Sequence, residues 1–259
     1  MTDSLVSIIM PSWNTADYIA DSIRSVLGQS YTNWELIIVD DCSTDGSYEV
    51  IRPFLADSRI RYYENENNMG AALTRNRALR KARGEWIAFL DSDDLWRPDK
   101  LEKQISFMED NGYVLSYTSY EKIDEKGALL GIRVTGPAIV DRHKMYQYDY
   151  IGQLTMMYSA RFFGLIQIED IRKNNDYAIR LRLFAKGGTK AFLLDENLAQ
   201  YRVRTSSISH DKITRKLKSH YDLFRVNDAR PAAVALWFAC RNMVFGVWKK
   251  MRYEKRIAK

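Results

Sequence analysis

Cysteine and long apolar runs are both scarce in this sequence. Its 259 residues contain two cysteines, Cys42 and Cys240, too few for a disulfide framework or a cysteine-rich zinc site. No apolar run approaches the roughly 20 residues that a membrane-spanning helix needs. The N-terminus also lacks the basic and apolar segments of a signal peptide. We therefore expect free thiols in a cytoplasmic protein that at most lies on a membrane surface.

Missing motifs exclude further classes of function. The first predicted strand is followed by Pro11-Ser12-Trp13-Asn14 and not by the Gly-x-Gly-x-x-Gly turn of a dinucleotide-dependent oxidoreductase. The net charge is +6 and the pI about 9.1, but no RNA-binding motif accompanies this charge. A phosphorylated substrate or an anionic membrane surface therefore explains the basic balance better than a nucleic acid. An apolar content of 46% suits one sizeable domain.

Short apolar strands alternate with amphipathic helices over the first 111 residues. The pattern predicts strands at 6–10, 34–39, 60–63 and 85–90, and helices at 17–27, 47–55, 71–83 and 99–111. This alternation is typical of an α/β domain with a mostly parallel central sheet flanked by helices. Further on, the pattern predicts an antiparallel pair at 113–123 and 129–135, a helix at 176–185, a strand at 190–194 and a helical, basic segment from 211.

An acidic cluster follows the strand at 85–90. Asp91 and Asp93 lie two residues apart, so on an extended backbone their carboxylates point the same way. Carboxylate pairs at the carboxyl end of a parallel strand suit Mg²⁺ or Mn²⁺ beside a phosphate. The alternative is an acidic turn in which Asp94 or Asp99 caps the next helix.

Polar residues also follow the other three strands. Trp13 could stack on a flat ring, and Asp41 could accept hydrogen bonds from a base or ribose. Gly70 permits close backbone approach, and Arg75 could face a diphosphate. Taken singly, each loop has a plainer explanation as a turn or a helix cap. Together they lie on one edge of the sheet and form a site that suits a nucleotide diphosphate.

These segments resemble family 2 glycosyltransferases of the GT-A fold. The resemblance covers residues 6–14, 39–47, 68–76 and 84–94, in the order found in the family. The second half resembles, more narrowly, bacterial enzymes of teichuronic acid, capsule and O-antigen assembly, through residues 151–155, 171–177 and 201–209. The resemblance implies a GT-A domain over 1–210, with a nucleotide-sugar half at 1–111 and an acceptor half at 112–210. Residues 211–259 form a basic amphipathic helical extension.

The resemblance also implies roles for individual residues. Asp41 would contact the uracil of a UDP-sugar, Asp93 with Asp91 would hold Mn²⁺ or Mg²⁺, and Asp176 would be the catalytic base. Arg202 or Arg204 would contact phosphate in a loop where relatives often carry histidine. The remaining nucleotide-binding positions would be Pro11, Ser12, Trp13, Asn14, Asn68, Gly70, Arg75, Asn76 and Ser92.

The implied function is an inverting, metal-dependent transfer of a hexose, glucose or galactose, from a UDP-sugar. The acceptor would be a saccharide or a polyprenyl diphosphate-linked saccharide in bacterial surface polysaccharide synthesis. One base opposite one leaving group predicts a single displacement, although Asp176 could instead be a plain helix cap. Two alternatives stay open: a non-catalytic binding relative, and an Asp-x-Asp phosphotransferase, which Asp94 disfavours.

The segment 211–259 interleaves basic residues with aromatic and aliphatic ones at helical spacing. This pattern is typical of a helix that lies on an anionic membrane surface, here the inner face of the cell membrane. The alternative is a helix that packs on the domain and exposes its basic face.

Overall fold

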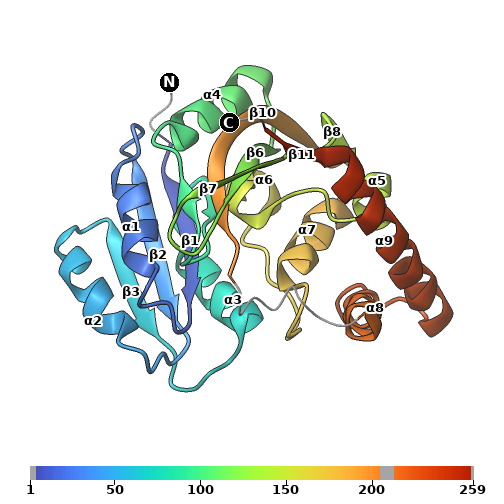
Figure 1. Cartoon of the computed structure of the whole chain (residues 1–259), viewed down its shortest axis with the longest axis horizontal. Helices are drawn as coiled ribbons and strands as arrows, with labels where there is room; N and C mark the ends of the chain where they lie inside the picture. Colours follow the sequence, from blue (N-terminus) through green and yellow to red (C-terminus); the bar gives the residue numbers. More distant parts are fainter. Residues whose placement is uncertain (1–3, 205–212, 258–259) are drawn as a thin grey trace.

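The computed structural model describes residues 4–204 and 213–257, and its first half follows the expected alternation of strands and helices (Figure 1). The elements are β1 (Val6–Ser12), α1 (Ile19–Leu27), β2 (Trp34–Asp40), α2 (Ser47–Ile51), η1 (Arg52–Ala56), β3 (Ile60–Glu64), α3 (Ala71–Lys81), β4 (Trp86–Phe89), β5 (Leu95–Trp96) and α4 (Lys100–Asn111). Each strand and helix predicted for this half is present, and the short β5 is an addition.

The second half adds further strands and short helices to the same sheet. Its elements up to the segment 205–212 are β6 (Leu115–Ile123), β7 (Leu129–Val134), β8 (Ile139–Asp141), α5 (Arg142–Gln147), η2 (Gln153–Thr155), β9 (Met157–Ser159), α6 (Ala160–Phe163), α7 (Asn175–Ala185) and β10 (Lys190–Arg202). The last elements are α8 (Ile213–Asp222), the π-helical turn η4 (Leu223–Asn227), α9 (Ala232–Tyr253) and β11 (Glu254–Arg256).

The strands β4, β1, β2 and β3 lie side by side in this order and run parallel. Both faces of this part are covered, so alternate residues enter different apolar clusters. Ile8 of β1 belongs to the cluster that holds residues of α1 and α4, whereas Ile9 belongs to the cluster with α3 and α7. Since parallel strands end at the same edge of a sheet, the four predicted loops share one edge.

The sheet as a whole is mixed, because its second half is largely antiparallel. β6 and β7 form the predicted antiparallel pair, and β9 runs antiparallel to both β4 and β6. β10 continues to Arg202, well beyond the strand expected at 190–194, and lies parallel to β6. Its register shifts between Leu194 and Ala199, so the acidic stretch there bulges within the strand and does not end it.

The C-terminal extension is integrated into this fold. Leu223, Phe224 and Ala235 are fully buried members of the cluster that includes α3 and α7. β11 pairs with β7 at the edge of the sheet, and α9 crosses beside α5 and α8 (Figure 1). The expected boundary at 210/211 lies outside the described residues. Within the described ranges, every helix is too short or too polar to cross a membrane.

Candidate active site

The acidic segment after β4 forms a turn. The main-chain N–H of Asp94 donates to the carbonyl oxygen of Asp91 at 3.1 Å, so the backbone here is not extended as expected. Two arginines nevertheless meet the two predicted metal ligands. Arg75 Nη2 donates to Asp91 Oδ1 at 2.8 Å, and Arg204 Nη1 donates to Asp93 Oδ2 at 2.9 Å. The turn therefore presents both carboxylates next to guanidinium groups from α3 and the end of β10.

The carboxylates of this turn repel one another. Burial and the neighbouring Asp91 carboxylate raise the pKa of Asp93, although Arg204 acts in the opposite direction. Burial, then the charges of Asp93 and Asp91, raise the pKa of Asp94 well above its usual value. Because these carboxylates are buried beside like charges, a further cation would stabilise their charged forms.

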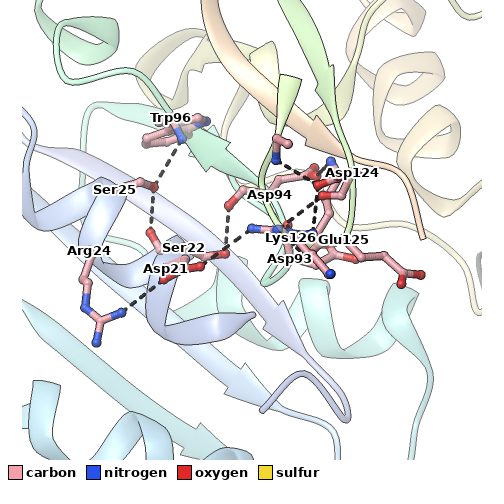
Figure 2. A network of polar contacts seen from close by, with 12 residues as sticks. Asp21, Ser22, Arg24, Ser25, Asp93, Asp94, Trp96, Asp124, Glu125 and Lys126 are labelled. Carbon is pink, nitrogen blue, oxygen red and sulfur yellow. Dashed lines mark hydrogen bonds and ion pairs between the residues drawn. The ribbon is translucent and has the colours of Figure 1, made fainter. Parts of the chain in front are cut away.

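Arg202 fixes this turn from within the protein. Its main-chain N–H donates to Asp94 Oδ1 at 2.9 Å, and its Nε donates to the carbonyl oxygen of Asp93 at 2.8 Å. Its Nη1 donates to the carbonyl oxygen of Glu125 at 2.8 Å. Figure 2 shows Asp93, Asp94 and Glu125 within one network of polar contacts. Arg202 is buried, so it positions the acidic turn, whereas Arg204 is partly exposed.

Asp41 organises the loop that precedes α3. Its Oδ1 accepts from the main-chain N–H of Met69 and from Asn65 Nδ2, at 2.8 and 2.7 Å, and its Oδ2 accepts from the N–H of Gly70 at 2.8 Å. Asn68 Nδ2 donates to the Asp41 carbonyl oxygen at 3.3 Å. Gly70 has φ +82°, which a residue with a Cβ rarely adopts. The predicted base-binding carboxylate is therefore buried and already bonded, and it shapes the loop around the expected nucleotide.

The first and second loops are joined through Asn14. Its main-chain N–H donates to Ser43 Oγ at 2.8 Å, and its Oδ1 accepts from the N–H of Thr44 at 2.9 Å. Pro11 and Ser12 lie inside β1 and not after it. The side chain of Trp13 is 56% exposed, so its ring is free to stack on a flat ligand. The expected base pocket thus has an exposed aromatic ring on a loop held by main-chain contacts.

Arg75 connects the two halves of the site. Besides its bond to Asp91, its Nη1 donates to Asn175 Oδ1 in the first turn of α7. The neighbouring Asn76 contacts a different segment. Its Nδ2 donates to the carbonyl oxygen of Ile168 at 2.7 Å, and its Oδ1 accepts from the N–H of Ile168 at 3.0 Å. Asn76 therefore ties α3 to the loop before α7, and its buried amide is already engaged with the main chain. Ser92 is buried in the acidic turn.

Asp176 lies in the first turn of α7, where Asn174 occupies the cap position. Its Oδ2 accepts from Arg180 Nη2 at 3.0 Å. Burial disfavours the charged form, but the guanidinium groups of Arg180 and Arg75 outweigh it, and the pKa of Asp176 lies below its usual value. The lowered pKa favours the charged form that a general base needs. Asn174 and not Asp176 occupies the N-cap position of α7, but the Asp176 carboxylate also accepts a hydrogen bond from the main-chain N–H of Tyr177 in the first turn.

Sequence reasoning missed the groups behind Asp176. Arg180 is 1% exposed and also donates to Asp149 Oδ1 from Nε at 2.7 Å. Lys249 of α9 donates to the carbonyl oxygen of Asp149 at 2.8 Å. The spacing of four residues between Asp176 and Arg180 on one helix was a usable signal for their pairing. Nothing in the sequence pattern links Asp149 and Lys249 to this site.

The central sheet with helices on both faces and the loops at one edge are typical of the GT-A fold of glycosyltransferases. The sequence profile of glycosyl transferase family 2 matches residues 7–165. The chain therefore belongs to glycosyl transferase family 2 and is a glycosyltransferase, as the resemblance of its loops predicts.

Relatives with known names support this assignment over most of the chain. The putative teichuronic acid biosynthesis glycosyltransferase TuaG of Bacillus subtilis is 44% identical over 209 residues, which are 80% of this chain and 82% of TuaG. The enzyme WfgD of Escherichia coli, named UDP-Glc:alpha-D-GlcNAc-diphosphoundecaprenol beta-1,3-glucosyltransferase, is 36% identical over 249 residues, 96% of each chain.

Solved structures share the fold at low sequence identity. S. aureus TarS 1-349 in complex with UDP-GlcNAc has a TM-score of 0.73 and 19% identity, over 93% of this chain and 73% of the TarS chain. The mannosyltransferase PcManGT from Pyrobaculum calidifontis, in complex with GDP-Man and Mn2+, has a TM-score of 0.58 and 17% identity, over 94% of this chain and 75% of that chain. The expected GT-A architecture is confirmed.

Proposed function

We propose that this glycosyltransferase moves a hexose, glucose or galactose, from a UDP-sugar to a saccharide or polyprenyl diphosphate-linked acceptor, with inversion, in bacterial surface polysaccharide synthesis. The names of TuaG and WfgD support the pathway, and the name of WfgD supports a UDP-glucose donor and a lipid-linked acceptor. The phosphotransferase alternative has no support from the family assignment.

The observation that carries the proposal is the position of Arg75. One guanidinium group donates both to Asp91 in the acidic turn and to Asn175, the residue before Asp176. The proposed diphosphate site and the proposed base therefore lie within the span of one side chain. A donor sugar held between them would have its leaving group on one side and a base on the other, as a single displacement requires.

The acidic turn fits a divalent cation that a donor diphosphate helps to hold. No cluster of three or more acidic, histidine or cysteine side chains suited to a metal occurs among the described residues. Mg²⁺ and Mn²⁺ sites in phosphate-transferring enzymes commonly use one or two carboxylates plus phosphate oxygens, and Asp91 and Asp93 match that need. Burial and the neighbouring Asp91 carboxylate raise the pKa of Asp93, so a bound cation would stabilise its charged form. When bound, the cation would stabilise the negative charge of the leaving UDP.

The chain's own residues supply the other requirements. Asp176, ionised through Arg180 and Arg75, would take the proton of the acceptor hydroxyl. Arg204 would exchange its ion pair with Asp93 for a contact with the donor phosphate, because guanidinium groups bind phosphate oxygens in pairs. The exposed ring of Trp13 would stack on uracil.

Two variants test these roles against a matched control. UDP binding is measured by calorimetry with and without Mn²⁺, and transfer from UDP-glucose and UDP-galactose is followed in the same samples. We expect Asp93→Ala to abolish the Mn²⁺-dependent part of binding and turnover. Asp176→Asn should keep UDP binding and lower kcat by about a thousandfold or more, as loss of a general base does.

The control is Asp170→Asn, which makes the same change at an exposed carboxylate before α7. It should behave as the wild type. Wild-type turnover in either of the other variants would remove the role assigned to that residue, and a wild-type chain that binds UDP but transfers no sugar would favour the non-catalytic alternative.

We further propose that α9 lies on the inner face of the cell membrane. One side of this helix packs on the domain through Ala235, Ala239 and Asn242. The other side leaves apolar residues exposed, which we call the apolar face of α9: Leu236, Trp237, Val244, Val247, Trp248 and Met251. Basic residues interleave with this face, and Arg241 lies over the Trp237 ring at 4.4 Å. An exposed apolar face with basic neighbours suits anionic lipid.

Val244→Glu tests this without disturbing the core, since Val244 is 69% exposed. Co-sedimentation with phosphatidylglycerol vesicles should weaken by at least tenfold, because loss of one buried Val side chain alone costs about 1.5 kcal/mol or more and the new carboxylate is also repelled. Tyr48→Glu on α2, at the opposite end of the molecule from α9, is the control and should bind as the wild type (Figure 1). Equal binding of both variants would contradict docking through α9.

A further inference from the structure

A cavity of about 350 Å³ lies between the C-terminal helices and the sheet. Residues of α8 and α9 form one wall, and Tyr120 of β6 and Val134 of β7 form part of the other. It is separate from the loops that surround the proposed donor site. Its volume falls within the range of small-molecule sites.

Positive charge dominates the lining of this cavity. Lys216 of α8 and Lys249 and Lys250 of α9 contribute ammonium groups, whereas Glu254 contributes a carboxylate. Glu254 already pairs with Lys122 at 2.7 Å. Within the described chain, no carboxylate forms an ion pair with Lys216 or Lys250. The cavity therefore offers uncompensated cations to an anion.

Two buried polar atoms in the lining also lack partners. The Nδ1 atom of His220 and the Oδ1 atom of Asn242 are both buried without a hydrogen bond. Asn242 is fully buried, so this acceptor is not turned toward bulk water. Buried polar groups are normally satisfied, and both residues belong to the wall of the cavity, so a ligand that draws this wall around it would supply the missing partners. A ligand that has both an anion and a hydroxyl would satisfy both atoms.

The cavity adjoins the proposed catalytic base. Lys249 Nζ donates to the carbonyl oxygen of Asp149, whose carboxylate binds Arg180, which in turn binds Asp176. Burial lowers the pKa of Lys249 to about 8 and that of His220 to about 4, and the negative charge of Asp176 opposes the lowering at both. Lys249 and His220, which line the cavity, thus lie within electrostatic range of Asp176.

The cavity also reaches the apolar face of α9. Val247 lines the cavity and is 64% exposed, next to Trp248 on the same face. A lipid chain that follows this face would enter the membrane beside the cavity. Gly246 lies in the same wall, where a Cβ would approach Tyr148 Cε2 to 2.8 Å, so the helix comes close to the domain here.

We propose that this cavity binds the diphosphate of a lipid-linked acceptor, with Lys216, Lys249, Lys250 and His220 around the anion and the acceptor sugar directed toward Asp176. The inference rests on the proposed function for the direction of the sugar, but the binding of the diphosphate does not depend on sugar transfer. Ammonium groups bind phosphate oxygens through charge-assisted hydrogen bonds.

The test is a calorimetric titration with geranyl diphosphate in EDTA, so that no divalent ion bridges the probe to the acidic turn. The double variant Lys216→Gln/Lys250→Gln should bind geranyl diphosphate at least tenfold more weakly than the wild type. Lys218→Gln removes one positive charge from α8 outside the cavity, as Lys216→Gln does at its wall, and should bind as the wild type. Arg204→Gln, at the proposed donor site, should also bind as the wild type.

Inorganic diphosphate is the second probe, because it has the diphosphate group without the isoprenyl chain and carries at least as much negative charge. Weaker binding of inorganic diphosphate than of geranyl diphosphate supports a lipid-linked ligand, and equal binding overturns that assignment. Equal affinity of the wild type and the double variant for geranyl diphosphate overturns the assignment of this cavity as the diphosphate site. These titrations measure binding without turnover, so they test the cavity separately from the proposed function. Loss of geranyl diphosphate binding with normal UDP-sugar transfer would contradict only the cavity proposal, and binding without transfer would contradict only the proposed function.

Discussion

Replacing Arg180 by methionine should both destabilise the fold and weaken the proposed base. Arg180 is 1% exposed, and its guanidinium group is bonded to Asp149, Gln153 and Asp176. The methionine side chain fills most of the same volume but carries no charge. Asp149 would then keep a buried carboxylate without its guanidinium partner, and burial already raises the pKa of that carboxyl despite Arg180.

The size of the loss follows from the burial of this pair. Removing one partner of a buried ion pair typically costs about 3–5 kcal/mol, because the other charge stays desolvated. The matched control is Arg182→Met, two residues further along α7. Arg182 pairs with Glu169 at the surface, with side chains 40% and 57% exposed, so its loss should cost at most about 1 kcal/mol.

The assay is urea unfolding at pH 7, with the free energy of unfolding compared across the wild type, the two single variants and Asp149→Leu/Arg180→Met. The double variant should recover part of the loss, because it removes both buried charges together. If Arg180→Met lowered the free energy of unfolding no more than Arg182→Met does, the argument that Arg180 neutralises buried carboxylates would be refuted.

Activity gives an independent readout of the same variant. The Arg180 and Arg75 charges hold the pKa of Asp176 below its usual value against the effect of burial. The charged form of Asp176 is therefore favoured in the native protein, and this contribution to stability is lost as the pH falls through the native pKa. Without Arg180 the native pKa rises, so the acidic limb of the pH profile of kcat/KM should move to higher pH, whereas in Arg182→Met it should stay in place.

Two further predictions concern single positions. Burial lowers the pKa of Lys100 from 10.5 to about 7. Between these two pH values the unfolded chain binds one more proton than the native protein, so the free energy of unfolding should rise with pH across this range. Lys100→Met should flatten that rise in urea unfolding, and an unchanged slope would contradict the argument. Gly246→Ala should lower the free energy of unfolding by about 1–3 kcal/mol, because its Cβ would meet Tyr148 at 2.8 Å, whereas Gly187→Ala, with no atom within 4 Å, should be close to neutral.

The first half of the molecule could be predicted from the sequence because its signals are local. Each parallel strand there is an apolar run that ends at a polar loop, and neighbouring parallel strands must end at one edge. The positions of Trp13 and Asp91 follow directly from where β1 and β4 end. What the sequence did not show is which of these polar groups are already bonded. Asp41 and Asn76 are committed to main-chain partners that are distant in sequence.

The second half could be predicted much less well, because long-range contacts decide it. The acidic stretch 195–197 has the composition of a loop, yet β10 passes through it as bulges since β6 supplies the pairing. The composition of the helical extension predicted a surface helix, but only one side of α9 is exposed. Its other side closes the core through Ala235 and Ala239.

This difference has a physical reason that bears on function. A donor nucleotide is recognised by loops that follow strands, so its site is encoded in short segments with their own turn and cap signals. The proposed acceptor cavity is instead assembled from β6, β7, α8 and α9. In the sequence its lysines have the pattern of surface residues, and only the packing of the helices brings them together. Among family members with the same donor loops, specificity for the acceptor should therefore vary with residues of the α8–α9 wall. Exchanging Lys216 and Lys250 for neutral residues should accordingly raise the KM for a diphosphate-linked acceptor and leave the KM for the UDP-sugar unchanged, and a parallel rise in both would contradict this division of the site.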